Sequence, residues 1–243
     1  MAKRKLTPLV ALYSIFIFYP IGIVITVLCA LATILMVPIW GDSRCSYYPG
    51  IFWARALMFI ALIKINVVGK ENFDPKKSYV FMSNHQSMLD IFLIYGWLNS
   101  KFKWIMKKEL RKMPFVGKAC AMMGHIFVDR SSAIKAKQSI QKAKEQLVGG
   151  TSIVVFPEGT RTKTGEIGKF KRGAFSIAKD THIPIIPMTI IGAYECVSSK
   201  EFCIKPGKIT LVIHPEVNTE NITNENFHQL VSDVRDQINS AFQ

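Results

Sequence analysis

The residues best suited to chemistry in this sequence are a histidine and an aspartate five positions apart. His85 follows the apolar run 79–82, which predicts a buried strand, and precedes the run 91–95, which fits a helix. We therefore expect the histidine at an exposed strand-to-helix turn, where a side chain can reach a ligand. Asp90 lies about one and a half helical turns further on, so its carboxylate can reach back to the imidazole. Such a pair can act as a general base held in one tautomer.

A histidine near an aspartate is more often structural than catalytic, so this pair needs support from elsewhere in the chain. The all-apolar run 152–156 is typical of a strand in the middle of a sheet, and it leads into Glu158, Gly159 and Arg161. The planar guanidinium of Arg161 suits a dianionic phosphate, although an arginine beside a glutamate is often only solvated. Gly159 allows a backbone conformation closed to other residues. Glu158 either contacts substrate or supports the loop.

The charge of the chain restricts its partners. The net charge of the 243 residues is +14, and it is concentrated between residues 64 and 172 because the segment from Glu216 onward is acidic. Such a basic surface attracts nucleic acid, an anionic membrane or a phosphorylated substrate. The absence of an RNA- or DNA-binding motif and the long apolar N-terminus argue against nucleic acid. Five scattered cysteines lack zinc-ligand spacing, which indicates reduced, structural thiols and no metal site.

The first sixty residues differ from the rest of the chain in charge and apolar content. The basic segment 3–5 precedes an uncharged run from 6 to 41, which is too long for a cleaved signal peptide and exceeds one membrane span. Pro20-Ile21-Gly22 could kink this run or bend it into a re-entrant hairpin. The patch 51–60, with aromatic residues nearby, indicates a helix at the membrane interface. We therefore expect residues 1–63 to be membrane-associated helices, with the basic start and the following domain on the cytoplasmic side.

From residue 64 onward, predicted strands and helices alternate. This alternation indicates an α/β fold over residues 64–243, with a mixed, largely buried sheet and helices on both faces. The expected strands are 65–69, 79–82, 102–106, 124–130, 152–156, 183–190 and 209–213. The expected helices, besides the one after His85, are 131–147, 172–179 and 227–238.

The motifs together are more specific than any one of them. Asn84-His85 followed by Asp90, with Phe156–Arg161 further on, resembles the glycerolipid acyltransferases of the PlsC type. Two lesser blocks agree with that family, namely 107–110 together with 124–130, and 183–187. The resemblance covers about residues 64 to 213. The short chain and its apolar N-terminus are most similar to the bacterial 1-acyl-glycerol-3-phosphate acyltransferases.

The resemblance implies a reaction and a set of roles. A fatty acyl group would move from acyl-CoA or acyl carrier protein to the 2-hydroxyl of the membrane lipid lysophosphatidate (1-acyl-glycerol 3-phosphate), giving phosphatidic acid. His85 would be the base and Asp90 its orienting partner, while Arg161 and Lys107 would bind phosphate. Asn84 would cap the helix or contact substrate. A thioester is already activated, so we expect neither a covalent nucleophile nor a cofactor. Another lysolipid or glycerol 3-phosphate is the alternative acceptor.

Functions of other classes are also conceivable from these residues. A serine hydrolase could use Ser87, His85 and Asp90, but the chain has no G-x-S-x-G elbow and Ser87 lies two residues from the histidine. Replacing Ser87 by Ala would inactivate a hydrolase, whereas a His–Asp acyltransferase should largely retain activity. A basic nucleic-acid-binding protein would show salt-sensitive binding without acyl transfer.

Overall fold

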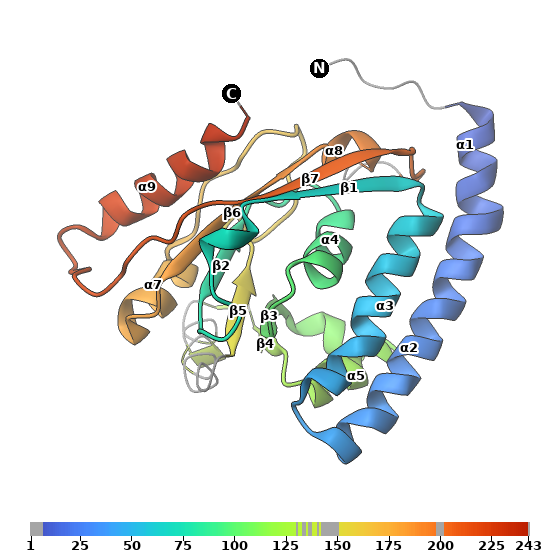
Figure 1. Ribbon diagram of the computed structural model, residues 1–243, viewed down its shortest axis with the longest axis horizontal. Helices are drawn as coiled ribbons and strands as arrows, with labels where there is room; N and C mark the ends of the chain where they lie inside the picture. The colour runs from blue at the N-terminus through green and yellow to red at the C-terminus, as the bar shows by residue number, and fades with distance from the viewer. Residues whose placement is uncertain are drawn as a thin grey trace.

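A computed structural model describes residues 7–129, 131–132, 135, 138–139, 141, 151–197 and 202–242. In this part of the chain, two long N-terminal helices pack beside a seven-stranded mixed sheet that carries helices on both faces (Figure 1). The expected fold class is therefore confirmed.

The apolar N-terminal run forms one continuous helix. It consists of α1 (Pro8–Tyr13), a π-helical turn (Ser14–Phe18) and α2 (Tyr19–Trp40). The π-helical turn ends two residues before Pro20, whose missing N–H removes one helical hydrogen bond, and the chain continues without reversing. A re-entrant bend at Pro20-Ile21-Gly22 is thus wrong. The most apolar part of this 33-residue helix has a mean hydropathy of 2.6, and the helix is long enough to cross a bilayer.

The chain reverses at Gly41–Ser43 instead, and α3 (Arg44–Ile60) returns alongside α2 (Figure 1). We call α1 to α3, with the π-helical turn, the helical hairpin. The part of the chain that follows the helical hairpin contains the sheet, and we call it the sheet domain. The inner face of α3 packs on α4 (Leu89–Trp97) of this domain. Many large apolar side chains on the outer face of the hairpin remain exposed, including Leu9, Phe16, Ile23, Leu28, Leu35, Ile39, Phe52 and Phe59.

The sheet has the strand order β1-β7-β6-β2-β5-β3-β4. Neighbouring strands run parallel, except for the antiparallel pair β6 and β7. The carboxyl ends of β2, β3, β4 and β5 therefore lie together at the same end of the sheet. We call this end the catalytic edge, because the predicted base His85 follows β2 there. The strands are β1 (Ile63–Val68), β2 (Val80–Ser83), β3 (Phe102–Lys107), β4 (Ile126–Val128), β5 (Ser152–Val155), β6 (Ile185–Ile191) and β7 (Gly207–Ile213).

Alternate residues of the central strands face two different cores. Phe81 of β2 packs with α3 and α4, whereas its neighbours Val80 and Met82 pack on the other face. That second face is covered by α7 (Arg172–Thr181) and α9 (Phe227–Ser240). This arrangement explains why β2 and β5 are apolar except for one buried serine each, because both of their faces are buried.

The structure also has elements that the sequence pattern did not indicate. These are α5 (Val116–Met122), α8 (Ala193–Cys196) and the 3₁₀ turns Lys70–Asn72 and Lys108–Lys112. The strand expected over 124–130 is shorter in the structure, where it consists of β4 alone. Most of the helix expected over 131–147 lies outside the described residues.

Candidate active site

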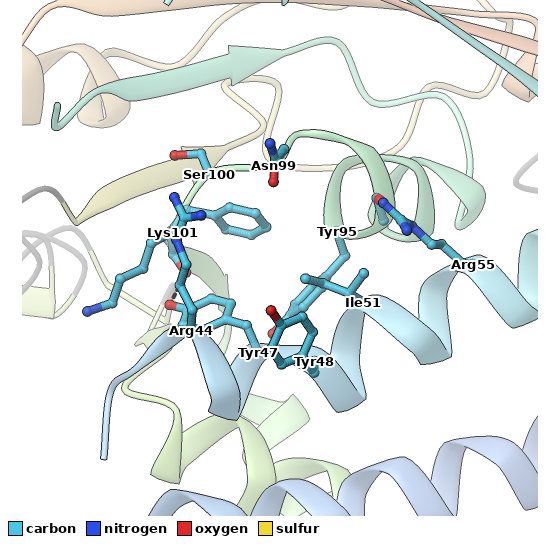
Figure 2. Close-up of a pocket in the computed structure, with 11 residues that line it drawn as sticks. Arg44, Tyr47, Tyr48, Ile51, Arg55, Tyr95, Asn99, Ser100 and Lys101 are labelled. Atoms are coloured by element: carbon cyan, nitrogen blue, oxygen red, sulfur yellow. Dashed lines mark hydrogen bonds between the residues drawn. The ribbon is translucent and has the colours of Figure 1, made fainter. Parts of the chain in front are cut away.

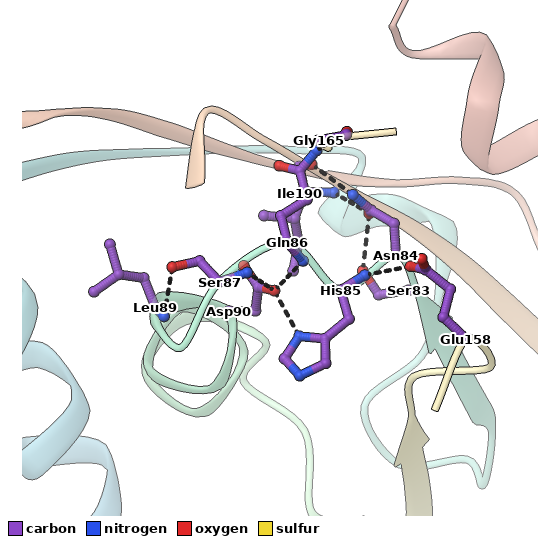
Figure 3. Close-up of polar contacts among 10 residues, drawn as sticks. All are labelled: Ser83, Asn84, His85, Gln86, Ser87, Leu89, Asp90, Glu158, Gly165 and Ile190. Carbon is purple, nitrogen blue, oxygen red and sulfur yellow. Dashed lines mark hydrogen bonds and ion pairs between the residues drawn. The ribbon is translucent and has the colours of Figure 1, made fainter. Parts of the chain in front are cut away.

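The turn between β2 and α4 is organised by one buried carboxylate. Asp90, in the first turn of α4, is fully buried. Its Oδ2 accepts hydrogen bonds from His85 Nδ1 at 2.8 Å and from the backbone N–H groups of Gln86 at 2.7 Å and Ser87 at 2.8 Å (Figure 3). The backbone N–H groups fix the carboxylate, and the carboxylate fixes the imidazole. Because Nδ1–H donates to Asp90, Nε2 is the nitrogen available to accept a proton.

The plane of the imidazole is fixed from the neighbouring strands. The ring of Phe156, just beyond β5, stacks on His85 with centroids 3.9 Å apart and planes 8° apart. Trp104 of β3 in turn stacks on Phe156, with ring centroids 5.7 Å apart. The His85 side chain keeps 14% exposure, and the ring edge that carries Nε2 points away from Asp90 (Figure 3). A substrate hydroxyl can therefore approach that nitrogen.

The segment after β5 clamps the backbone of the histidine. The N–H of His85 donates to Glu158 Oε1 at 2.7 Å, and its carbonyl accepts from the N–H of Thr162 at 2.8 Å. The other oxygen of Glu158 accepts from the N–H of Gly168 at 2.8 Å. Burial raises the pKa of Glu158, and these two N–H bonds partly offset that effect. Both oxygens of Glu158 thus support the loop.

Two glycines allow these close contacts. Gly159 has a φ of +77°, which side chains rarely tolerate. A Cβ at Gly168 would come within 2.8 Å of Glu158 Oε2, so a side chain there would push the carboxylate away. Gly159 is among the predicted site residues, whereas Gly168 is not. In the sequence, Gly168 is only one of two glycines in a loop, and nothing in its spacing connects it to the glutamate.

The two predicted phosphate ligands lie at the same edge of the sheet. Arg161 is exposed and directly precedes Thr162, whose N–H binds the His85 carbonyl. Lys107 ends β3; its side chain is 60% exposed, and Nζ lies 3.8 Å from Glu109. The fold therefore brings both cations to the catalytic edge, which is where ligands bind in open α/β sheets.

Two other residues of the turn have structural contacts. Asn84 is buried, and its side-chain amide bonds both the N–H (2.8 Å) and the carbonyl (2.9 Å) of Ile190 in β6. The expected helix-capping role of Asn84 is wrong, since α4 begins after Met88 and Asn84 joins two strands instead. The hydroxyl of Ser87 accepts from the N–H of Leu89 and points away from the imidazole (Figure 3).

Two cavities of the described residues lie away from this turn. One is lined by α3 and the connection from α4 to β3, including Arg44, Arg55 and Lys101 (Figure 2). Lys101 precedes β3, so this cavity is at the opposite end of the strand from Lys107. A second cavity lies among α2, α3 and α5. In the part of the chain that is described, no group of three or more His, Cys, Asp or Glu side chains could hold a metal ion.

Comparison with known proteins shows the family of this chain. Residues 64–191 match the model of the acyltransferase family. The 1-acyl-sn-glycerol-3-phosphate acyltransferase of Saccharomyces cerevisiae is 32% identical over 220 residues, which are 89% of this chain and 70% of the yeast protein. The alpha enzyme of the same name from Mus musculus is 35% identical over 74% of this chain and 64% of its own length. A relative from Chlamydomonas reinhardtii is matched over only 53% of its length.

A solved structure extends the similarity to the N-terminal helices. The crystal structure of the 1-acyl-sn-glycerophosphate acyltransferase PlsC from Thermotoga maritima superposes with a TM-score of 0.80. The two sequences are 27% identical, and the match covers 96% of this chain and 93% of the Thermotoga protein. The His–Asp turn, the Glu158 clamp and the fold thus occur together in a chain that belongs to the acyltransferase family.

Proposed function

We propose that this protein transfers a fatty acyl group from a thioester, either acyl-CoA or acyl carrier protein, to the 2-hydroxyl of 1-acyl-glycerol 3-phosphate. The product is phosphatidic acid for phospholipid synthesis. The observation that carries the proposal is the His85–Asp90 pair, which leaves Nε2 free at the catalytic edge. The yeast, mouse and Thermotoga proteins named for this reaction support the choice of acceptor.

In the proposed mechanism, His85 is the general base. Nε2 takes the proton of the acceptor hydroxyl as its oxygen bonds to the thioester carbonyl carbon. The tetrahedral intermediate then collapses, the carbon–sulfur bond breaks, and the departing thiolate receives the proton from the imidazolium. Asp90 orients the ring and stabilises its positive charge in the intermediate state. A positioned histidine contributes roughly 10²–10⁴ to the rate of such a step.

Direct attack without an acyl-enzyme is part of the proposal. Ser87, one of the two serines nearest to His85 in sequence, accepts a hydrogen bond from Leu89 and is buried. A thioester needs no further activation before an alcohol attacks it. Initial rates should therefore give intersecting double-reciprocal lines, with no burst of free thiol when the acceptor is omitted. An acyl group trapped on Ser87 or Cys120 would contradict this mechanism.

The acceptor is proposed to be bound through its phosphate and presented from a membrane. Arg161 can form a bidentate pair with the phosphate dianion, and Lys107 adds a second charge. The long apolar helix and the exposed apolar outer face of the helical hairpin support membrane association. We propose that the sheet domain faces the cytoplasm, where a water-soluble acyl donor can reach the lipid at the membrane surface.

A substrate comparison tests this function. The purified protein in detergent is offered lysophosphatidate, glycerol 3-phosphate and a monoacylglycerol, each with acyl-CoA and with acyl carrier protein as donor. We expect lysophosphatidate to be the best acceptor and the phosphate-free monoacylglycerol to be poor. Arg161→Ala should reduce transfer to lysophosphatidate strongly and transfer to monoacylglycerol little. Preference for glycerol 3-phosphate or for another lysolipid would replace the proposed acceptor.

A further inference from the structure

A lysine that the proposed mechanism does not use lies beside the segment that clamps the His85 backbone. Lys171 lies just before α7, and its side chain runs along the backbone of Gly159. A Cβ at Gly159 would meet Lys171 Nζ at 2.8 Å, Cε at 3.2 Å and Cδ at 3.3 Å. Three successive side-chain atoms thus occupy the space that a glycine leaves open.

The fold holds the backbone of Lys171 firmly at this place. Its N–H donates to the carbonyl of Pro157 at 2.8 Å, on the segment that clamps His85. The preceding residue, Phe170, is buried, and the following helix is fixed in the core by Phe175 and Ile177. The point from which the side chain starts is therefore determined by the fold.

Among the described residues, none of the ion pairs involves the ammonium group of Lys171. The adjacent carboxylate, Glu158, is buried, and its oxygens accept from the N–H groups of His85 and Gly168. Lys171 is exposed. An exposed ammonium that lies along the loop clamping the base, with no acidic partner among the described residues, is suited to an anion supplied by the substrate.

We propose that Lys171 is a further phosphate-binding residue of the acceptor site, placed by Gly159 on the loop that carries Arg161. The inference rests on the proposed function, because the phosphate is that of the acceptor. Arg161 would supply the bidentate fork and Lys171 a point charge. Gly159 has a second reason to be a glycine, since a side chain there would displace the lysine.

The test compares two lysines of the same segment. Lys171→Ala is measured against Lys169→Ala, which removes another exposed cation two residues earlier. We expect Lys171→Ala to lower kcat/KM for lysophosphatidate by roughly 10–100-fold, as for loss of a hydrogen bond to a charged group. It should change kcat/KM for a monoacylglycerol less than about threefold, a difference of only about 0.7 kcal/mol. Lys169→Ala should change neither by more than that, and Lys171→Arg should recover part of the loss.

Other results would overturn the inference in distinguishable ways. Equal losses on both acceptors would make Lys171 a structural support, and a lowered Tm would accompany them. A raised KM for acyl-CoA, with the acceptor discrimination unchanged, would assign the lysine to the phosphates of the donor. If the wild-type protein itself does not prefer lysophosphatidate over monoacylglycerol, the proposed function fails together with this inference. If the wild type keeps that preference and Lys171→Ala keeps it undiminished, only the inference fails.

Discussion

The helical hairpin and the sheet domain are both rich in apolar residues, but they bury them in different surroundings. Along the most apolar part of the Pro8–Trp40 helix, only 17% of the residues are buried within the protein. In β2 and β5, every residue is buried. The protein itself supplies the apolar environment of the strands, whereas the outer face of the hairpin requires another one, and a lipid bilayer meets that requirement.

The two regions also differ in where the hydrogen-bond partners of their polar side chains lie in the sequence. Three hydroxyls of the long helix donate to carbonyls of their own helix: Ser14 to Val10, Thr26 to Gly22 and Thr33 to Cys29, all at 2.6–2.9 Å. Such bonding within one helix suits a lipid environment. The tyrosines at the start of this helix instead join it to other segments, since Tyr13 donates to Ile60 and Tyr19 to Phe202. Polar groups at the catalytic edge bond between elements distant in sequence, as in the Asn84 contact with Ile190. The hairpin is thus suited to attachment and the edge to precise geometry.

The largest effect that separates the regions is expected at His85. His85→Ala should lower kcat by roughly 10²–10⁴, because the proton acceptor is lost. Binding to vesicles should remain at the wild-type level, since the hairpin is untouched. Turnover and vesicle co-sedimentation are measured on the same preparation. Near-normal turnover in a folded His85→Ala protein would refute the mechanism, and Asp90→Asn should be impaired through loss of imidazole orientation.

A matched pair of leucines sharpens the difference in burial. Leu93 in α4 is 0% exposed, whereas Leu35 in α2 is 69% exposed. Leu93→Ala should lower the free energy of unfolding in detergent by about 2–5 kcal/mol, because it leaves a cavity. Leu35→Ala should change it by less than about 0.5 kcal/mol. Denaturant titration of both variants gives the two values. Equal destabilisation would show that the outer face of α2 is covered by protein.

The sequence allowed the central parts of this architecture to be predicted. Unbroken apolar runs marked the strands because both faces of the sheet are covered, as β2 and β5 illustrate. The spacing of His85 and Asp90 correctly indicated contact, since a turn followed by one helical turn brings the two side chains together within a few residues. Local periodicity and short-range spacing are therefore informative for this chain.

Contacts between distant segments could not be predicted from spacing. Nothing near Asn84 in the sequence indicates that its amide binds Ile190, 106 residues away. The contact of Glu158 with His85 spans 73 residues and depends on β2 and β5 being neighbours. Likewise, the long apolar run does not reveal that its partner is α3, because pairing of helices depends on tertiary packing. The π-helical turn could not be predicted either. In it, the backbone N–H of Tyr19 donates to the carbonyl of Ser14, and the helix continues through Pro20 without a re-entrant bend.

A pair of glutamates tests the network at the catalytic edge. Glu158 accepts two backbone N–H groups, and an amide in its place retains only one good acceptor. Glu158→Gln should therefore lower kcat/KM by roughly 10–100-fold through a displaced His85, a loss of about 1–3 kcal/mol. Glu166→Gln, in the same loop but exposed, is the control and should stay near the wild-type rate. If both variants retain full activity, the clamp on the His85 backbone is dispensable.

The smallest expected effect concerns His125, where the two regions meet. This histidine lines the cavity among α2, α3 and α5, and its Nδ1 accepts the N–H of Trp104 at 3.3 Å. Nearby, Lys103 Nζ contacts Asp42 at 2.6 Å, which joins the hairpin to β3. Burial, with a smaller contribution from Lys103, lowers the pKa of His125 to about 3.

The lowered pKa of His125 determines how the free energy of unfolding changes with pH. Between pH 6.5 and about 3, the unfolded chain binds a proton at His125 and the folded protein does not. The free energy of unfolding should therefore fall as the pH is lowered through this range, by up to about 1.4 kcal/mol per pH unit from this residue. Burial also lowers the pKa of His214, which acts in the same direction. His125→Asn keeps an acceptor for Trp104 and should make the slope shallower without abolishing it. Denaturant titrations in detergent at pH 5, 6 and 7 measure that slope, and an unchanged slope would mean that water reaches His125 between the hairpin and the sheet domain.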